Sequence, residues 1–376
     1  MFSNYFSIIS TTVKNILIVS SEVENIAPSL KSHFPDAEYT CIDLASDADS
    51  IPDIVAVNSS GVSVQIRNQK YDCIIMRALE RLYTPSPVFK DLASLISENG
   101  KLFCSVKNMQ YSGIIEPLLI GDFEYSETRL INHNQMRFYT YSSFIKLILD
   151  SGWLIGRFCH SSTEFNGDLA DRLREYFKSK KMNENLLMAY LSIYEFFFEC
   201  TLNNDYFAGL PSPTPITFIV AVNNERIFKE YLLASPVFRK GHPHQLVPVK
   251  EASSAASALH TGIHYAVNDC IVWVHQDVYL PENWDRIFCH KIREIEHKHS
   301  DVGIFGVFGV NSAGENPVYS GYVVDRIIFH NSKRFPFEVH SVDECLFSFR
   351  KSEYPGTDPN ELRLFASLAD AKTWLD

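Results

Sequence analysis

Two regions of the chain alternate short apolar runs with amphipathic stretches, and this alternation restricts the fold more than any other feature. Apolar runs of four to nine residues are typical of buried strands, and the stretches between them have helical spacing. Strands that alternate with helices through short connections predict a mainly parallel sheet covered by helices on both faces. The expected strands are residues 15–19, 38–44, 71–76 and 101–106 in the first region and 216–222, 244–249, 271–274 and 302–310 in the second.

Between the two regions the alternation stops. Residues 166–202 contain two helix-like stretches with no strand between them, and we interpret the dense apolar run at 185–202 as a packed helix. The following stretch LPSPTP, Leu210–Pro215, has three prolines in six residues and predicts a linker. We therefore predict a first domain over residues 1–160, a helical connector with a proline-rich linker over 161–212, and a second domain over 213–376.

Composition and charge exclude several classes of protein. The chain has 376 residues, of which 46% are hydrophobic, so it is long enough for two cores. A net charge of −11 argues against a nonspecific nucleic-acid binder, which carries a basic face. No uncharged apolar run reaches about 18 residues, and the N-terminus lacks a basic region, so we expect no transmembrane segment and no signal peptide. The eight cysteines form no CxxC pair, which favours reduced thiols and a cytoplasmic location.

The stretch IVWVHQDVYLPENW, residues 271–284, carries the most informative polar residues. His275, Gln276 and Asp277 directly follow a predicted buried strand. Ligands collect at the carboxyl ends of strands in open α/β sheets. A carboxylate there can hold Mg²⁺ or Mn²⁺ against two phosphates. These three residues alone favour a structural alternative, in which Asp277 caps a turn and His275 is a hydrogen-bonded core residue.

The surrounding segments resemble the family-2-like glycosyltransferases of the GT-A fold. The similarity is greatest to a bacterial subgroup that has His-Gln-Asp-Val where other members have Asp-x-Asp. It covers about Pro213 to Ser352, in the family's order. The matching segments are PITFIVAVNNERIFKEYL, LVPVKEASSAASALHTGIHYAVNDCIVWVHQDVYLPENW, DVGIFGVFGVNSAGE and VHSVDECLFSFRKS.

This resemblance implies a role for several residues. Asp277 would be the metal-binding acid, with His275 in the place of the motif's first acid. Nucleotide contacts would come from the ends of the first two strands of this domain, namely from Val222, Asn223, Asn224, Lys250 and Glu251.

The same resemblance implies residues on the acceptor side. Asp343 would be an acceptor-side acid, although a turn carboxylate is nearly as good an interpretation. An inverting transferase also needs a base for the acceptor hydroxyl, and Asp370, after the Asp358–Pro359 turn, is the nearest candidate. The family's aromatic positions are not recognisable here, so we expect this end of the domain to be shortened or divergent.

Residues Lys14 to about Phe158 resemble the class I S-adenosylmethionine-dependent methyltransferases, most clearly from Asn99 to Trp153. Asp43 would hold the ribose hydroxyls of the cofactor. The turn after the first strand, Val19–Asn25, has no glycine, although glycine normally lets the backbone approach the cofactor. Arg77 and Arg81 replace the usual Asp and His. These departures favour a degenerate domain that serves as a scaffold or positions an acceptor.

We therefore expect two Rossmann-like α/β domains, methyltransferase-like and then GT-A-like, joined by a helical connector. The expected function is transfer of a sugar from a nucleotide-sugar donor to a hydroxyl of a bacterial surface glycan, with a divalent Mn or Mg ion. One alternative is an active S-adenosylmethionine (SAM)-dependent sugar methyltransferase. Another is a noncatalytic protein that binds a glycan or a nucleotide.

Overall fold

The computed structural model divides the chain into two compact units, the first over residues 1–203 and the second over residues 204–376. Each unit is described by itself. The structure describes residues 9, 12–20, 23–42, 56–58, 63–64, 69–77, 79–122, 125, 131–180, 183–299, 302–311, 318–325, 327–330 and 338–354.

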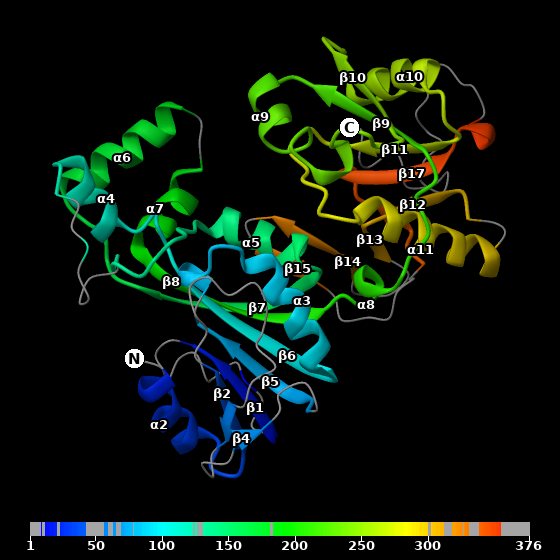
Figure 1. Ribbon diagram of the computed structural model, residues 1–376. Helices are drawn as coiled ribbons and strands as arrows, with labels where there is room; N and C mark the ends of the chain where they lie inside the picture. Colours follow the sequence, from blue (N-terminus) through cyan, green and yellow to red (C-terminus); the bar gives the residue numbers. More distant parts are fainter. Residues whose placement is uncertain are drawn as a thin grey trace. The chain divides into compact units, whose positions relative to one another are not determined.

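The first unit is built on one sheet with the strand order β4-β3-β2-β1-β5-β6-β8-β7 (Figure 1). Strands β2, β1, β5 and β6 are parallel, and β8 runs antiparallel between β6 and β7. The parallel part confirms the strands expected in the first region. The strands are β1 (Asn15–Val19), β2 (Glu38–Ile42), β3 (Ala56–Asn58), β4 (Ser63–Val64), β5 (Tyr71–Met76), β6 (Ile96–Lys107), β7 (Trp153–Ser162) and β8 (Ile193–Leu202).

Helices cover both faces of this sheet. Leu30 and Phe34, in and just after α2, pack against Ile16 and Ile18 of β1.

Thr140 begins α5 with a capping box. Its side chain accepts from the Ser143 N–H, and the Ser143 side chain accepts from the Thr140 N–H. The helices are α2 (Val23–His33), the 3-10 turn η2 (Leu79–Arg81), α3 (Pro85–Leu95), α4 (Ser112–Leu119), α5 (Tyr141–Asp150), α6 (Asp168–Ser179) and α7 (Glu184–Ser192).

The prediction of an uninterrupted helix at 185–202 is wrong, because Ile193–Leu202 is strand β8. Both faces of β8 are buried. Phe198 contacts Phe144 of α5, and Phe197 stacks on Phe103 of β6. A strand buried on both faces lacks polar alternation, so its sequence cannot be told from that of a buried helix.

The residues predicted as a separate connector divide between the two units. Helices α6 and α7 and strand β8 lie in the first unit, where β8 pairs with β6. The proline-rich stretch lies in the second unit, where helix α11 (Trp284–Lys298) contacts it: the Arg286 Nε donates to the Pro211 carbonyl at 3.2 Å. Helix α3 ends at Leu95, and Gly100 lies inside β6.

The second unit contains a five-stranded sheet, ordered β10-β9-β11-β17-β12, and a four-stranded sheet, ordered β15-β14-β13-β16 (Figure 1). Residues 302–310, expected as one strand region, are divided between the two sheets at Val307. The strands are β9 (Ile216–Val222), β10 (Gln245–Lys250), β11 (Cys270–Val274), β12 (Ile304–Gly306), β13 (Phe308–Asn311), β14 (Val318–Asp325), β15 (Ile327–His330), β16 (Ser341–Val342) and β17 (Leu346–Arg350).

Helix α10 (Ala255–Tyr265) contains small residues that let it pack closely on the sheet. A Cβ added to Gly262 would lie 2.2 Å from the Ile219 Cγ2 of β9, so α10 approaches the sheet more closely than any side chain would allow there. None of the described helices is long and apolar enough to cross a membrane. The helices of this unit are α8 (Asn204–Phe207), α9 (Glu225–Glu230), the 3-10 turn η3 (Pro236–Phe238), α10 (Ala255–Tyr265), α11 (Trp284–Lys298) and the 3-10 turn η4 (Lys351–Glu353).

Candidate functional site

One edge of the five-stranded sheet collects most of the predicted site residues. Strands β10, β9 and β11 are parallel, so their carboxyl ends lie at the same edge. Strand β17 is antiparallel to β11 and begins at that edge, where Val274 pairs with Leu346. The segments at this edge, which we call the β9–β11 edge, are residues 222–225, 250–251, 275–277 and 343–345.

Gln276 joins the two segments that follow β9 and β11. Its Oε1 accepts the backbone N–H groups of Asn223 at 3.1 Å and Asn224 at 3.0 Å. Its Nε2 donates to the Asn223 Oδ1. The Asn224 side chain has a separate structural role, because its Oδ1 caps α9 by accepting from the N–H groups of Arg226 and Ile227. The sequence places Gln276 within the His-Gln-Asp stretch but predicts no role or contact for its side chain.

An ion pair connects the ends of β9 and β10. The Lys250 ammonium binds the Glu225 carboxylate, and this contact lowers the pKa of Glu225. Glu251 follows with a φ of 56°, a left-handed conformation that is unfavourable for a residue with a side chain. Lys250 and Glu251 thus lie at the predicted edge, and Lys250 is already paired with a carboxylate.

The acids of the His-Gln-Asp and SVDECL stretches lie around Cys345. Burial raises the pKa of the Cys345 thiol well above its usual range, and the carboxylates of Asp343 and then Asp277 raise it further. The Asp343 Oδ1 accepts the Cys345 N–H at 2.8 Å, which is a turn-capping contact. Asp277 is exposed. Its carboxylate is therefore accessible at the edge.

His275 is anchored by its backbone. Its N–H donates to the Cys345 carbonyl at 3.0 Å, which continues the pairing of β11 with β17. Its Nε2 lies 4.0 Å from a Glu344 carboxylate oxygen, and its side chain is about a third exposed. Among the described residues, no three His, Cys, Asp or Glu side chains come together as a metal-binding group. Asp43, Asp358 and Asp370 lie outside the described residues.

The first unit has its own polar cluster beyond the carboxyl end of β5. Arg77 follows β5 and its Nη2 binds the Glu195 Oε1 of β8 at 2.9 Å, with both side chains nearly buried. The Glu80 Oε1 accepts the Lys107 N–H at 2.8 Å, and burial raises the pKa of Glu80. The arginine that replaces the expected acid of the methyltransferase pattern is therefore part of a protein-internal ion pair.

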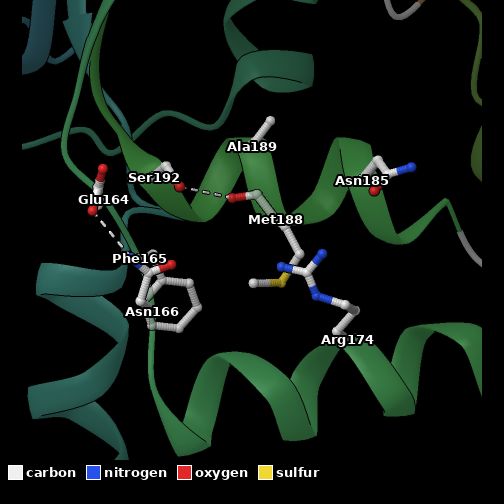
Figure 2. A pocket seen from close by; sticks show the side chains of 8 residues that line it. All are labelled: Glu164, Phe165, Asn166, Arg174, Asn185, Met188, Ala189 and Ser192. Atoms are coloured by element: carbon white, nitrogen blue, oxygen red, sulfur yellow. Dashed lines mark hydrogen bonds between the residues drawn. The ribbon is translucent and has the colours of Figure 1, made fainter.

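A cavity of about 400 Å³ lies in the first unit between α6 and α7, apart from both of these edges. Figure 2 shows the Arg174 side chain reaching from α6 toward Met188 of α7, with Phe165 and Asn166 at one side. The Glu164 carboxylate accepts from the Asn166 amide at 3.1 Å. No sequence pattern predicted this cavity. Its lining residues are Glu164, Phe165, Asn166, Arg174, Asn185, Met188, Ala189 and Ser192.

Comparison with known proteins adds two findings. Residues 217–342 match the model of a family described as "glycosyltransferase like family". This range contains residues 222–225, 250–251 and 275–277 of the β9–β11 edge and ends just before residues 343–345. No curated protein matches the chain.

The first unit is similar to solved methyltransferase structures. A SAM-dependent methyltransferase from Methanosarcina mazei has 12% identity and a TM-score of 0.31, and the match covers 53% of this chain and 97% of that one. One from Archaeoglobus fulgidus has 8% identity, a TM-score of 0.31 and coverage of 52% and 88%. The plantazolicin methyltransferase BpumL, solved in complex with a triazolic desmethylPZN analog and SAH, has 15% identity, a TM-score of 0.31 and coverage of 53% and 81%.

The expected glycosyltransferase-like similarity is therefore found, on the expected part of the chain. Both units are α/β, and the first has a Rossmann-like sheet. The second unit contains, over residues 217–342, a glycosyltransferase-like domain.

Proposed function

We propose that the second unit transfers a sugar from a nucleotide-sugar donor to a hydroxyl group of a glycan, with the help of a divalent metal ion. The observation that carries this proposal is the exposed carboxylate of Asp277 at the β9–β11 edge, within a glycosyltransferase-like domain. The turn after β9 and the end of β10 lie at the same edge and would contact the nucleotide. The eight cysteines are all free thiols, which supports a reducing, cytoplasmic setting.

The donor atoms at the edge suit a Mg²⁺ or Mn²⁺ ion that is held jointly by the protein and the phosphates of a substrate. They do not suit a metal ion that is held by protein side chains alone. Mg²⁺ is usually bound by one or two carboxylates together with substrate phosphates and water. Asp277 supplies one exposed carboxylate, and the described residues add no third acidic, His or Cys ligand. A bound metal would supply charge stabilisation for the departing nucleoside diphosphate. His275, whose Nε2 is within 4.0 Å of Glu344, would border this position.

The acceptor side is less defined by the described residues. Asp343 uses its Oδ1 to cap the turn at Cys345. We keep Asp343 as an acceptor-side acid and Asp370 as a candidate base, to be distinguished by substitution. The bacterial surface glycan as acceptor rests on the family resemblance.

For the first unit we propose a noncatalytic role in holding the glycan acceptor. Two observations favour it. The cavity between α6 and α7 is lined by amide, carboxylate, hydroxyl and guanidinium groups together with the apolar side chains of Phe165 and Met188. This mixture suits an acidic sugar, which carries a carboxylate. The Arg77 side chain, at the position where the methyltransferase pattern has an acid, pairs with Glu195 within the protein.

The test of the proposed transferase is turnover of nucleotide-sugars by wild-type protein and Asp277→Asn, each with and without Mn²⁺. The substitution keeps the size of the side chain and removes its charge, so we expect turnover to fall at least about a hundredfold. The melting temperature should not change, because Asp277 is exposed and contributes little to packing.

Other outcomes separate the alternatives. Equal turnover of both proteins would contradict the proposed metal role of Asp277. A lower melting temperature with unchanged turnover would identify Asp277 as a structural cap. Wild-type protein that binds nucleotide without turning over any common donor would favour a noncatalytic binding protein.

A further inference from the structure

Strands β9 and β11 stop pairing before they reach their site residues. The last paired residues are Ile219 and Trp273. Asn223 lies four positions beyond the first of these and Gln276 three positions beyond the second. The backbone hydrogen bonds of the sheet therefore do not set the separation of the two segments at the edge.

The side chain of Gln276 spans this interval. It uses both ends of its amide: Oε1 accepts two successive N–H groups, at 3.1 Å and 3.0 Å, and Nε2 donates to the Asn223 side chain. A glutamate would accept the two N–H groups but could not donate, and an asparagine is one carbon shorter. Only glutamine satisfies all three contacts with this geometry.

Two consequences follow for the neighbouring groups. Because the Asn223 Oδ1 is occupied by Gln276, Asn223 presents its Nδ2 as a donor, and no described residue accepts from it. Gln276 also directly precedes Asp277, so a fixed Gln276 restricts the backbone that carries the exposed carboxylate. The turn after β9 and the carboxylate after β11 are thus held by one side chain.

We propose that Gln276 is a positioning residue that sets the distance between the nucleotide-binding turn at 223–224 and the metal-binding carboxylate of Asp277. This inference rests on the proposed transferase function. Such a residue acts through its neighbours, so its loss should weaken the joint binding of metal and diphosphate more than it weakens the fold.

Gln245 provides a matched control in the same sheet. It begins β10, at the opposite edge, and its amide also makes three contacts: Oε1 accepts from Thr217 at 2.8 Å and from the Val267 N–H at 2.8 Å, and Nε2 donates to the Tyr265 carbonyl at 2.9 Å. Gln276→Met and Gln245→Met therefore remove the same number of hydrogen bonds from side chains of the same shape.

The experiment measures binding of uridine, guanosine, adenosine and thymidine diphosphates with Mn²⁺ by calorimetry, together with melting temperatures. Gln276→Met should weaken the affinity for the preferred diphosphate by about tenfold, a change of the size that one or two hydrogen bonds produce. Gln245→Met should bind as the wild type does, although its melting temperature falls. In turnover assays, KM for the donor should rise in Gln276→Met and not in Gln245→Met.

Equal affinity of Gln276→Met and wild type, or an equal loss in both variants, would overturn the positioning role. If Gln276→Met does not fold, Gln276→Glu replaces it in the same measurements. This variant can still accept the two backbone N–H groups and loses only the hydrogen bond that Nε2 donates to Asn223. Amide hydrogen exchange at Asn223 and Asn224 separates this proposal from the transferase proposal. If wild-type protein binds no diphosphate, the transferase proposal fails, and unchanged exchange in Gln276→Met would overturn the positioning role independently.

Discussion

Glu80 shows how one buried acid links three segments of the first unit. Its Oε1 accepts the N–H of Lys107 at the end of β6. Its carbonyl accepts the N–H groups of Met136, at 2.7 Å, and Arg137, at 2.9 Å. Burial is the main cause of its raised pKa, and the hydrogen bond from Lys107 opposes that shift. The side chain is therefore a point where packing and charge conflict.

This conflict predicts a pH dependence of stability. An acid whose pKa is higher in the folded state than in the unfolded state binds protons more tightly when folded, so stability falls as the pH rises above the ordinary value of 4.5 toward the folded value. Glu80→Gln keeps an oxygen for Lys107 and removes the ionisation. We measure the free energy of unfolding in urea between pH 4.5 and 7. As the pH rises, the value for Glu80→Gln should increase relative to the value for the wild type. Parallel curves for the two proteins would contradict this prediction.

The helix pair α6 and α7 lines the cavity of about 400 Å³ in the first unit. The two helices pack through Ala170, Met188 and Leu191 around Phe165, and polar groups surround this apolar contact. Arg174 reaches across the cavity, whereas Arg172, two residues earlier, points to the exposed Asp168 and binds its carboxylate at 2.8 Å. One helix thus presents one arginine to the cavity and another to solvent.

These two arginines predict a difference in glycan binding. Arg174→Gln should weaken binding of an oligosaccharide that contains glucuronic acid by about tenfold, because hydrogen bonds to charged groups contribute about 1.5–3 kcal/mol. Arg172→Gln removes the same charge from the same helix and should leave binding unchanged, since its exposed ion pair contributes little. Titration followed by calorimetry or by Trp fluorescence measures both. Equal losses in the two variants would indicate attraction by net charge alone and would exclude the cavity as the site.

The whole chain combines a unit with a Rossmann-like sheet and a unit that contains a glycosyltransferase-like domain. The two units differ in how far they keep the residues that the sequence resemblances imply. The second unit retains an exposed acid at the β9–β11 edge. In the first unit, the N–H groups of Ser20 and Arg77 bond to neighbouring strands, and Arg77 pairs with Glu195. The turn after β1 has no glycine to bring the backbone close to a ligand.

We therefore expect the full chain to bind SAM no more tightly than about millimolar, which corresponds to about −4 kcal/mol. Calorimetry with SAM and with S-adenosylhomocysteine measures this directly. Micromolar binding of either would instead support an active sugar methyltransferase. A nucleoside diphosphate titrated into the same sample with Mn²⁺ is the positive control for folded protein.

Sequence by itself determined the class of fold and the positions of the parallel strands in both units, because strand–helix alternation is a local property of the chain. It also located the edge where Asn223, Lys250 and Asp277 come together, since parallel strands bring their carboxyl ends to one side. Only the tertiary structure decided that Ile193–Leu202 is a strand, because its identity depends on backbone pairing with β6 and β7 and on the packing of α5 against Phe198. The contacts of Gln276 were likewise beyond local patterns: they join positions 53 and 52 residues apart, and only the folded sheet brings such distant positions within hydrogen-bonding distance.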